Sequence, residues 1–492
     1  MKTQAVPAAA EAHQYPTNTF TRTPGATARL LLCLVGSIAS PALFAVGQYT
    51  AGALATAGVS EPGAAGASVT TYVPYSPMPA HDNARMRWIT SEVALVKDNH
   101  GGDLVAFFRG DTTLHAAVSP DDGDSWAWVD PIATIGVAMP NMIAQSSDGK
   151  LHVLSDTGDL SYSRLLLQRN PDGHVTGFSA EVIDLPLPAT VNFGELRTQI
   201  IDGIDQNGNE TLFYAVYDWA SSGTDRARIQ AGRTSVGAGT NPTAAAQFVS
   251  LSNSAGSTVL VRFGGADWFA SPHNNGVQMA QHPLSKDLYL YYGPLDTGDT
   301  STQNTYPIQR LRVSTSANNT WTLTGTQIVD GYSGGYASQI GPAISTANAV
   351  WYLRISSAQG VVIDRVGADG SVTNPIASPY GTPHLAGWTA FAMNQAETQA
   401  WVGGWISYDS AVDGTARWAA HWEQGSGWMR APADTGLSDT NGMGRSAGWE
   451  QGLVLMMLDT SSSFPYSGAP SFATIRTTSP SSADLIFADS FE

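Results

Sequence analysis

The sequence contains one cysteine, Cys33, and only four lysines among its 492 residues. Since Cys33 lies in an apolar run near the N-terminus, the rest of the chain can form neither a disulfide nor a cysteine-ligated zinc site, and thiolate catalysis is excluded there. Charged residues make up 13% of the chain, and acidic residues outnumber basic ones by 41 to 24, for a net charge of −17. A strongly acidic field repels phosphate backbones, so we expect no nucleic-acid partner.

Helical patterns and several common catalytic motifs are also missing. Between residues 85 and 478 no apolar run has a convincing helical period. The chain contains no His-Glu-x-x-His and no phosphate-binding Gly-Lys-Ser/Thr motif. The segment from Asp205 to Glu210 has the oxygen-rich composition of a cation loop, but its Asn-Gly pair is more typical of a β-hairpin. We therefore expect no metal ion and no cofactor.

The N-terminal region, residues 1–47, has the features of a secretory leader. Arg22 and Arg29 precede an apolar run at 30–46, and small residues follow at cleavage-like positions. An uncleaved anchor is the alternative, but Pro41 and the glycine and serines around it make a weak membrane helix. We expect a protein that is secreted or periplasmic, exported from a bacterium, without a stable membrane anchor.

The remaining chain divides by composition. Residues 48–84 are rich in Ala, Gly, Ser and Pro and are predicted to be a linker, and residues 479–492 are predicted to be a C-terminal tail. Between them, residues 85–478 hold short apolar or alternating segments, many preceded by a turn, at intervals of roughly 40 to 75 residues. Four short strands per interval predict an all-β fold, a β-propeller. The units begin near 88, 137, 195, 273, 336, 386 and 443, which gives about seven four-stranded blades, or six if one has been split.

One turn carries a dense set of polar residues, Ser119-Pro-Asp121-Asp-Gly123-Asp-Ser125-Trp126. The side chain of Asp121 can accept backbone N–H groups within its own turn, and Gly123 can take a positive φ. Trp126 can cover the apolar face of the hairpin. The local chemistry thus favours a structural role for Ser119, Asp121, Gly123, Ser125 and Trp126 over catalysis or calcium binding.

This turn resembles the Asp box of the sialidase-like β-propellers, and two degenerate copies keep its register at 314–321 and 421–428. In that family the box is structural and lies away from the active site. Sialidases also share an Arg-Ile-Pro near the first strand and an arginine triad for the sugar carboxylate, since several cations hold one carboxylate strongly. This chain has no Arg-Ile-Pro, and Glu92 falls near the expected arginine. That departure argues against sialidase activity and leaves open whether the chain is an enzyme.

A weaker resemblance is to propeller polysaccharide lyases of the ulvan-degrading kind. It is carried by SPHNNGVQMAQHPLSKDLYLYYGP, in which a His-Asn pair precedes a turn and an aromatic strand. In such lyases a His or Tyr removes the C5 proton of a uronate while its carboxylate is neutralised. The resemblance implies that His273 is a base and Tyr336 an acid or nucleophile, with Arg197, Asn274 and Arg87 as substrate ligands.

Each of these residues also has an ordinary structural interpretation. His273 would be a surface or backbone-bonded turn residue, and Arg197 would pair with Glu195 or a nearby Asp. Tyr336 would be a strand aromatic, and Arg87 a solvated charge.

The sequence as a whole predicts a monomeric, exported, sialidase-like propeller whose partner is a glycan or polysaccharide. It would act on or recognise acidic glycans, as a polysaccharide lyase or a diverged glycosidase. The alternative is a non-catalytic propeller that binds glycans or proteins.

Overall fold

The computed structural model describes the strands of the chain and the turns that join them. The described residues are 47–49, 69–74, 93–109, 114–123, 125–132, 143–156, 160–188, 195–219, 225–253, 255–264, 277–292, 306–315, 320–332, 340–356, 360–376, 385–407, 415–425, 427–431, 443–449, 451–458 and 470–478. All of them belong to one unit, Ala45–Glu492. The predicted leader, apart from Gly47, and the predicted tail at 479–492 lie outside them. None of the helices within this described part is long and apolar enough to cross a membrane.

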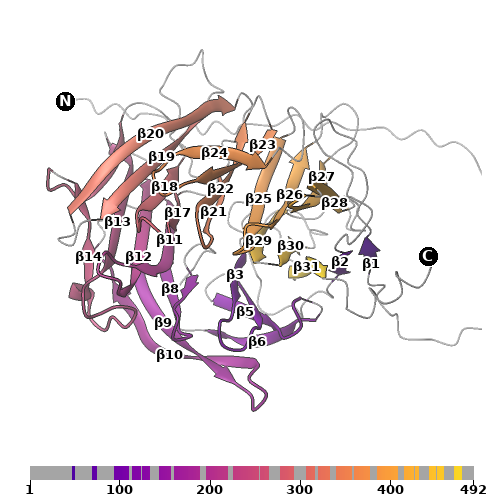
Figure 1. Cartoon of the computed structure of the whole chain (residues 1–492). Coiled ribbons are helices and arrows are strands. Elements are labelled where there is room, and N and C mark those ends of the chain that lie inside the picture. Colours follow the sequence, from indigo (N-terminus) through magenta and orange to yellow (C-terminus); the bar gives the residue numbers. More distant parts are fainter. Residues whose placement is uncertain are drawn as a thin grey trace, which may run out of the picture. The chain divides into compact units, whose positions relative to one another are not determined.

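Seven sheets, formed almost entirely by antiparallel pairing, make up this unit (Figure 1). The first sheet holds β3 (Val93–Lys97), β4 (Leu104–Arg109), β5 (Leu114–Ser119) and β6 (Ala127–Ile132). The second holds β7 (Ile143–Gln145), β8 (Leu151–Asp156), β9 (Leu160–Arg169) and β10 (Val175–Pro186). The third holds β11 (Glu195–Ile204), β12 (Glu210–Trp219), β13 (Asp225–Thr234), β14 (Phe248–Ser250) and β16 (Val259–Gly264), with the 3₁₀ helix η2 (Ala245–Gln247) before β14.

The other four sheets follow the same plan. The fourth holds β17 (Val277–Gln281), β18 (Leu288–Tyr292), β19 (Tyr306–Thr315), β20 (Thr320–Tyr332) and the short β15 (Ser252–Asn253). The fifth holds β21 (Ile340–Ser345), β22 (Val350–Ser356), β23 (Gly360–Val366) and β24 (Val372–Ile376). The sixth holds β25 (Leu385–Met393), β26 (Gln399–Ser407), β27 (Thr415–Glu423) and β28 (Gly427–Ala431). The seventh holds β29 (Met443–Trp449), β30 (Gly452–Leu458), β31 (Pro470–Thr478), β2 (Val69–Pro74) and β1 (Gly47–Tyr49).

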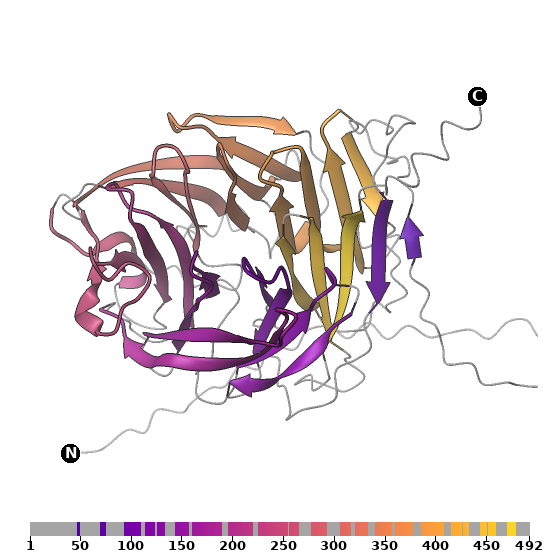
Figure 2. The same ribbon diagram turned by 60° about the horizontal axis from the view of Figure 1, so that its bottom comes forward.

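The first strands of the seven sheets form a closed ring. The contacts run from β3 to β7, β11, β17, β21, β25 and β29, and from β29 back to β3. Figure 2 shows the sheets following one another around this ring in chain order. Radial repetition of small antiparallel sheets with closure is the defining arrangement of a β-propeller, so the predicted fold is confirmed.

The seventh sheet joins segments from both ends of the unit. Strand β2 pairs antiparallel with β31, Val69 lying opposite Thr478, and β1 pairs with β2. Both strands fall almost wholly within 48–84, the segment predicted to be a linker. Pairing between distant segments in one sheet holds the ring closed, because opening it would break the ladder between β2 and β31.

Apolar side chains fill the spaces between neighbouring sheets. Phe107 of the first sheet and Leu151 of the second are buried in one cluster, and Phe213 of the third and Leu290 of the fourth in another. Sheets that bury both faces need apolar side chains on both, which explains the near-continuous apolar segments in the sequence.

The predicted unit boundaries agree closely with the ring. The first strands begin at residues 93, 143, 195, 277, 340, 385 and 443. The predicted starts at 88, 137, 195, 273, 336, 386 and 443 each lie within six residues of these. Spacing of turns and apolar segments therefore located the sheets correctly.

The oxygen-rich segment at 205–210 forms a hairpin. Gly208 has φ +86° in the turn between β11 and β12. Asp205 accepts hydrogen bonds from the backbone N–H of Asn207 (2.8 Å) and of Asn209 (2.9 Å). The carboxylate is engaged within its own turn, as expected of an Asx-type hairpin.

Candidate functional site

The turns between the first and second strands of successive sheets contact one another, so they lie on one side of the ring. We call this side the hairpin face, made of residues 98–103, 146–150, 205–209, 282–287, 346–349 and 394–398. The linking hydrogen bonds run from Asn99 Nδ2 to Ser146 O (2.8 Å), from Ser147 N to Glu210 Oε1 (2.6 Å), from Ile204 N to Gln281 Oε1 (2.7 Å), from Ser345 Oγ to Gln281 O (2.6 Å) and from Thr346 Oγ1 to Glu397 Oε1 (2.6 Å). The first strand of each of these sheets ends at the hairpin face. The described starts of the first strands therefore lie toward the opposite side of the ring.

Asp98 anchors the hairpin face between the first and second sheets. Its side chain is buried and accepts hydrogen bonds from Arg169 Nη1 (2.5 Å), Gln145 Nε2 (2.9 Å) and Gly101 N (2.6 Å). Burial opposes ionisation, but these hydrogen bonds and the guanidinium charge outweigh it and lower the pKa of Asp98 to about 2. The group is thus a structural anion rather than a proton carrier near neutral pH.

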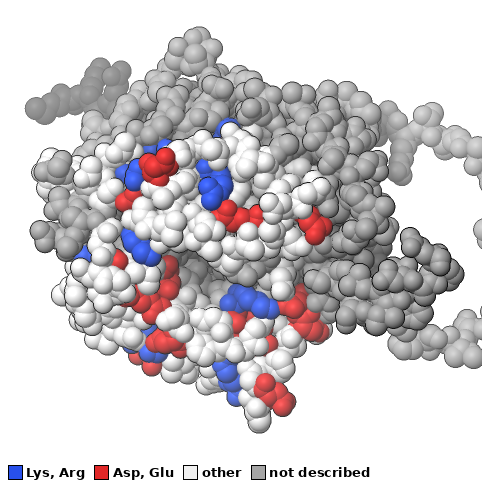
Figure 3. Space-filling view, in the orientation of Figure 1, with Lys and Arg blue, Asp and Glu red and all other residues white. Residues whose placement is uncertain are grey.

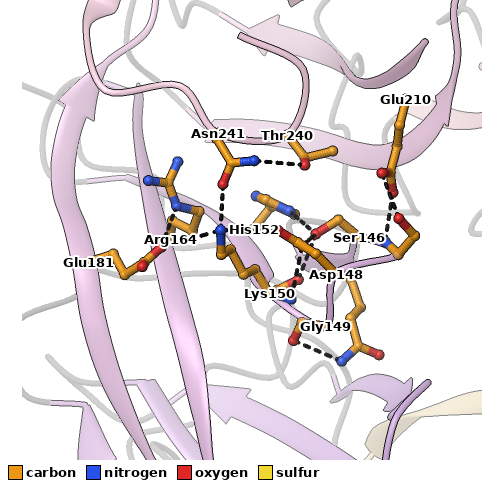
Figure 4. Close-up of polar contacts among 12 residues, drawn as sticks. Ser146, Asp148, Gly149, Lys150, His152, Arg164, Glu181, Glu210, Thr240 and Asn241 are labelled. Atoms are coloured by element: carbon orange, nitrogen blue, oxygen red, sulfur yellow. Dashed lines mark hydrogen bonds and ion pairs between the residues drawn. The ribbon is translucent and has the colours of Figure 1, made fainter.

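A larger polar group, which we call the interblade cluster, lies between the second and third sheets (Figure 4). Lys150 Nζ lies 3.0 Å from Asp148 Oδ2 and donates to Asn241 Oδ1 at 2.5 Å. Arg164 Nε donates to Glu181 Oε2 at 2.8 Å, and its Nη1 donates to the carbonyl of residue 242. Both cations of the cluster are therefore already paired with carboxylates.

Beneath these ion pairs lies a buried imidazole. His152 Nδ1 is 2.8 Å from Tyr162 Oη, and Nε2 is 2.8 Å from Ser146 Oγ. Burial is the main cause that lowers the pKa of His152 to about 3, and burial raises the pKa of Tyr162. Both groups are neutral over the physiological range, so they join strands of the second sheet without exchanging protons there.

Two carboxyl groups, Asp202 and Glu210, form what we call the carboxyl pair. Asp202 lies opposite Leu212 in the register of β11 and β12, and Glu210 lies opposite Ile204, so all four residues share the face turned toward the second sheet. Both oxygens of Glu210 accept hydrogen bonds from Ser147, one from N and one from Oγ, each at 2.6 Å.

The carboxyl pair holds a proton near neutral pH. Burial of Asp202, followed by the charge of Glu210 and a hydrogen bond to it, raises the pKa of Asp202 to about 8. Both residues are half-buried, and Oδ1 of Asp202 is fully buried without a hydrogen-bond partner. A carboxyl that holds its proton near neutral pH can act as a general acid.

Replacing Asp202 with Asn is expected to make stability less dependent on pH. The folded-state pKa is raised, so Asp202 contributes stability that is complete below its unfolded pKa and is lost as pH rises through about 8. The amide stays neutral throughout. The Tm of Asp202→Asn relative to the original protein should therefore increase between pH 5 and about pH 8 and level off at higher pH. Glu210→Gln serves as the matched control, because it removes the charge that acts on Asp202. A flat difference across this range would contradict the assignment.

The acidic turn at 119–126 has the hydrogen bonds expected from its sequence. It connects β5 to β6, the third and fourth strands of the first sheet. Asp121 accepts from Ser119 Oγ (2.8 Å), Ser125 N (2.8 Å) and Ser125 Oγ (2.6 Å), and Gly123 has φ +89°. Trp126 is buried. The turn is structural in its contacts, while membership of the Asp-box repeat family stays a prediction.

Asp121→Ala should destabilise the protein by about 1–2 kcal/mol, because three hydrogen bonds that close the turn are lost together. Asp122→Asn in the same turn is the control. It removes only the ion pair with Lys97, which is partly exposed, and should cost less than about 1 kcal/mol. Urea unfolding of both variants gives the comparison, and equal losses would contradict the structural role of Asp121.

The residues predicted to carry catalysis are mostly outside the described part of the chain. His273, Asn274, Tyr336 and Arg87 all fall there, so their roles stay predictions. Arg197 lies on β11, where its backbone pairs with Tyr217 near the start of the strand. The carboxyl pair was missed by sequence reasoning because Glu210 was assigned only to a hairpin and Asp202 to no role.

The described surface carries both signs of charge. In Figure 3 the Lys and Arg side chains lie among Asp and Glu side chains rather than in a patch of one sign. Among the described residues, no group of three or more His, Cys, Asp or Glu side chains is arranged to hold a metal ion.

Comparisons with known proteins identify no family for this chain. No protein-family model matches the sequence, and no curated protein matches it. Among solved structures, a puromycin hydrolase is similar with 12% identity and a TM-score of 0.44 over 80% of this chain, which spans only 54% of that protein. An ulvan lyase of a polysaccharide lyase family is similar with 11% identity and a TM-score of 0.40, over 73% of this chain and 91% of the lyase. The BP39L lectin from Burkholderia pseudomallei is similar with 13% identity and a TM-score of 0.39, over 75% of this chain and 92% of the lectin. Likenesses at this level carry no conclusion about activity.

Proposed function

We propose that this chain is an exported β-propeller that acts on acidic glycans, as a polysaccharide lyase or a diverged glycosidase. The observation that carries the proposal is the carboxyl pair, because Asp202 is protonated at neutral pH and lies beside Glu210. Cleavage of a glycosidic bond requires a group that donates a proton to the leaving oxygen, and a carboxyl with a raised pKa can do so. We therefore assign Asp202 as the proton donor.

The surroundings of the carboxyl pair suit a sugar. Ser147 hydrogen-bonds Glu210, and Asn241 hydrogen-bonds both Lys150 and Thr240 (Figure 4). Hydroxyl, amide and ammonium groups side by side can exchange hydrogen bonds with sugar hydroxyls and with a carboxylate. An acidic sugar at this place would compete with Asp148 for Lys150.

The proposal is tested by incubating the protein with sialylated and uronate-containing glycans and analysing the products. Free sialic acid would indicate a sialidase, new ultraviolet absorbance from an unsaturated uronate a lyase, and shorter saturated oligosaccharides another glycosidase. Asp202→Asn should lower the rate at least 100-fold, since general acid catalysis contributes about that much or more. Rates unchanged in Asp202→Asn but lost in His273→Ala or Tyr336→Phe would transfer the chemistry to the residues predicted from the sequence.

A non-catalytic propeller that binds glycans or proteins is the second candidate. It is favoured by the pairing of Lys150 with Asp148 and of Arg164 with Glu181, which leaves these cations already neutralised by the protein. Retention on acidic glycans without any product, and with equal retention by Asp202→Asn, would support this candidate over the enzyme.

A further inference from the structure

The contact between the fourth and fifth sheets buries a set of polar side chains distinct from the carboxyl pair. Tyr291 on β18 lies opposite Arg310 on β19, and Tyr352 on β22 lies opposite Asp364 on β23. The rings of Tyr291 and Tyr352 stack across the boundary, with centroids 4.1 Å apart and planes at 30°. Arg310 and Asp364 are thus connected through two stacked phenol rings.

Arg310 is a buried cation without a carboxylate partner among the described residues. Only 7% of the residue is exposed. Its Nη2 donates to the carbonyl of Gly370 at 3.2 Å, and its guanidinium lies 5.6 Å from the ring centroid of Tyr289. Neither contact neutralises the charge, and Nε and Nη1 are buried with no hydrogen-bond partner. An uncompensated buried charge costs several kcal/mol, so the protein alone leaves this site incomplete.

The nearby carboxylate, that of Asp364, forms its ion pair with another arginine, Arg354. Asp364 accepts from Arg354 Nε at 2.5 Å and Nη2 at 3.3 Å, and it also accepts from Asn374. Among the buried side chains, the two arginines and one aspartate leave one positive charge in excess, while the exposed Asp369 carboxylate acts on Arg312. Arg312, the other cation on β19, is neutralised by Asp287 at 2.6 Å and adds no net charge.

The unused polar atoms around Arg310 are donors. The hydroxyls of Tyr289 and Tyr291 are buried without partners, as is Nη1 of Arg354, while the hydroxyl of Tyr352 is directed at Asp364. Burial raises the pKa of Tyr291 and of Tyr352 well above their usual values, so both hydroxyls keep their protons. Several donors with an excess positive charge call for an acceptor that carries negative charge. Water could accept these hydrogen bonds but could not neutralise the charge.

We propose that a small, singly charged anion, a halide or a free carboxylate, binds at the boundary of the fourth and fifth sheets. Arg310 supplies the charge and two donors, and the hydroxyl of Tyr291 supplies a further donor. The anion completes the contact between the two sheets and stabilises the folded ring. This site is independent of the proposed glycan chemistry, because it lies between other sheets than the carboxyl pair.

The test measures Tm while sodium chloride or sodium acetate replaces a bulky buffer sulfonate at constant ionic strength. The original protein should gain roughly 2 °C or more, because a ligand bound only by the folded state stabilises it by mass action. Arg310→Met should lose this gain while being at least as stable in the bulky sulfonate. Arg169→Met, whose guanidinium pairs with Asp98 in another part of the ring, should keep the gain. Chloride and acetate responses, compared with each other, identify which anion is accepted.

If Arg310→Met does not fold, a second variant and a crystal structure still test the proposal. Tyr291→Phe keeps the stacked ring and removes one donor. The chloride concentration that gives half of the maximal increase in Tm should therefore be at least threefold higher than for the original protein. Crystals grown with bromide should show anomalous density within hydrogen-bond distance of Arg310. Equal salt responses in the original protein and both variants, or density for water only at Arg310, would overturn the proposal.

Discussion

Asp364→Ala should lower the free energy of unfolding by about 3–5 kcal/mol, one of the two largest effects expected in this protein. The carboxylate of Asp364 is fully buried, and its partner Arg354 has only 6% of its surface exposed. Removing the carboxylate leaves Arg354 as a second uncompensated cation near Arg310. Two like charges without a counter-charge are then buried, which destabilises the contact between the fourth and fifth sheets.

A double-mutant cycle separates the loss of the pair from the loss of volume. Asp364→Leu with Arg354→Met replaces the ion pair by apolar side chains, and such replacements are often close to neutral. The double variant should therefore be more stable than either single variant of the cycle, Asp364→Leu or Arg354→Met, as measured by urea unfolding. Additive losses in the cycle would contradict the importance of this pair.

Gly232→Ala is the second large effect, and we expect a loss of roughly 3 kcal/mol or more. Gly232 lies opposite Tyr214 in the register of β12 and β13. The ring of Tyr214 crosses the glycine so closely that a Cβ there would lie 2.2 Å from its Cζ and Oη. The ring is fully buried and packs against Phe248, so it has no room to move aside. The measurement is urea unfolding, or the yield of soluble protein if the variant does not fold.

The matched control is Gly177→Ala in β10. A Cβ at Gly177 would approach Gln168 Oε1 at 2.8 Å, which is the end of a flexible side chain. This variant should change stability by less than about 1 kcal/mol, since such a side chain can move. The combination Tyr214→Leu with Gly232→Ala should be less damaging than the sum of its single changes. Similar losses for both glycines would show that strand propensity, rather than the Tyr214 ring, sets the cost.

Much of the fold follows from the sequence because the signals for it are local. Turn residues such as the Asn207-Gly208 pair, and the apolar segments after them, fix where hairpins occur, so the starts of the sheets were located within a few residues. The Asp121 turn is likewise determined by residues within eight positions of one another. Hydrogen bonds between residues so close in the sequence can be predicted without knowing how the sheets pack in the ring.

The candidate sites depend on contacts between sheets, which the sequence pattern does not contain. Glu210 follows a clear hairpin, but Ser147, its partner, is 63 residues away. The raised pKa of Asp202 depends on burial against the second sheet, and the charge of Arg310 is unpaired only because Asp364 is taken by Arg354. Residue type and spacing cannot show which of many charges will meet a partner, since that is decided by packing between distant segments.

Binding of acidic glycans is tested by the retention of the purified protein on an array of sialylated and uronate-containing glycans, compared with neutral glycans of the same backbone. We expect retention at least about tenfold stronger on the acidic glycans, and a loss of that preference as salt concentration rises. Equal or absent retention on both sets, at low and at high salt, would contradict the proposal that this propeller acts on or recognises acidic glycans.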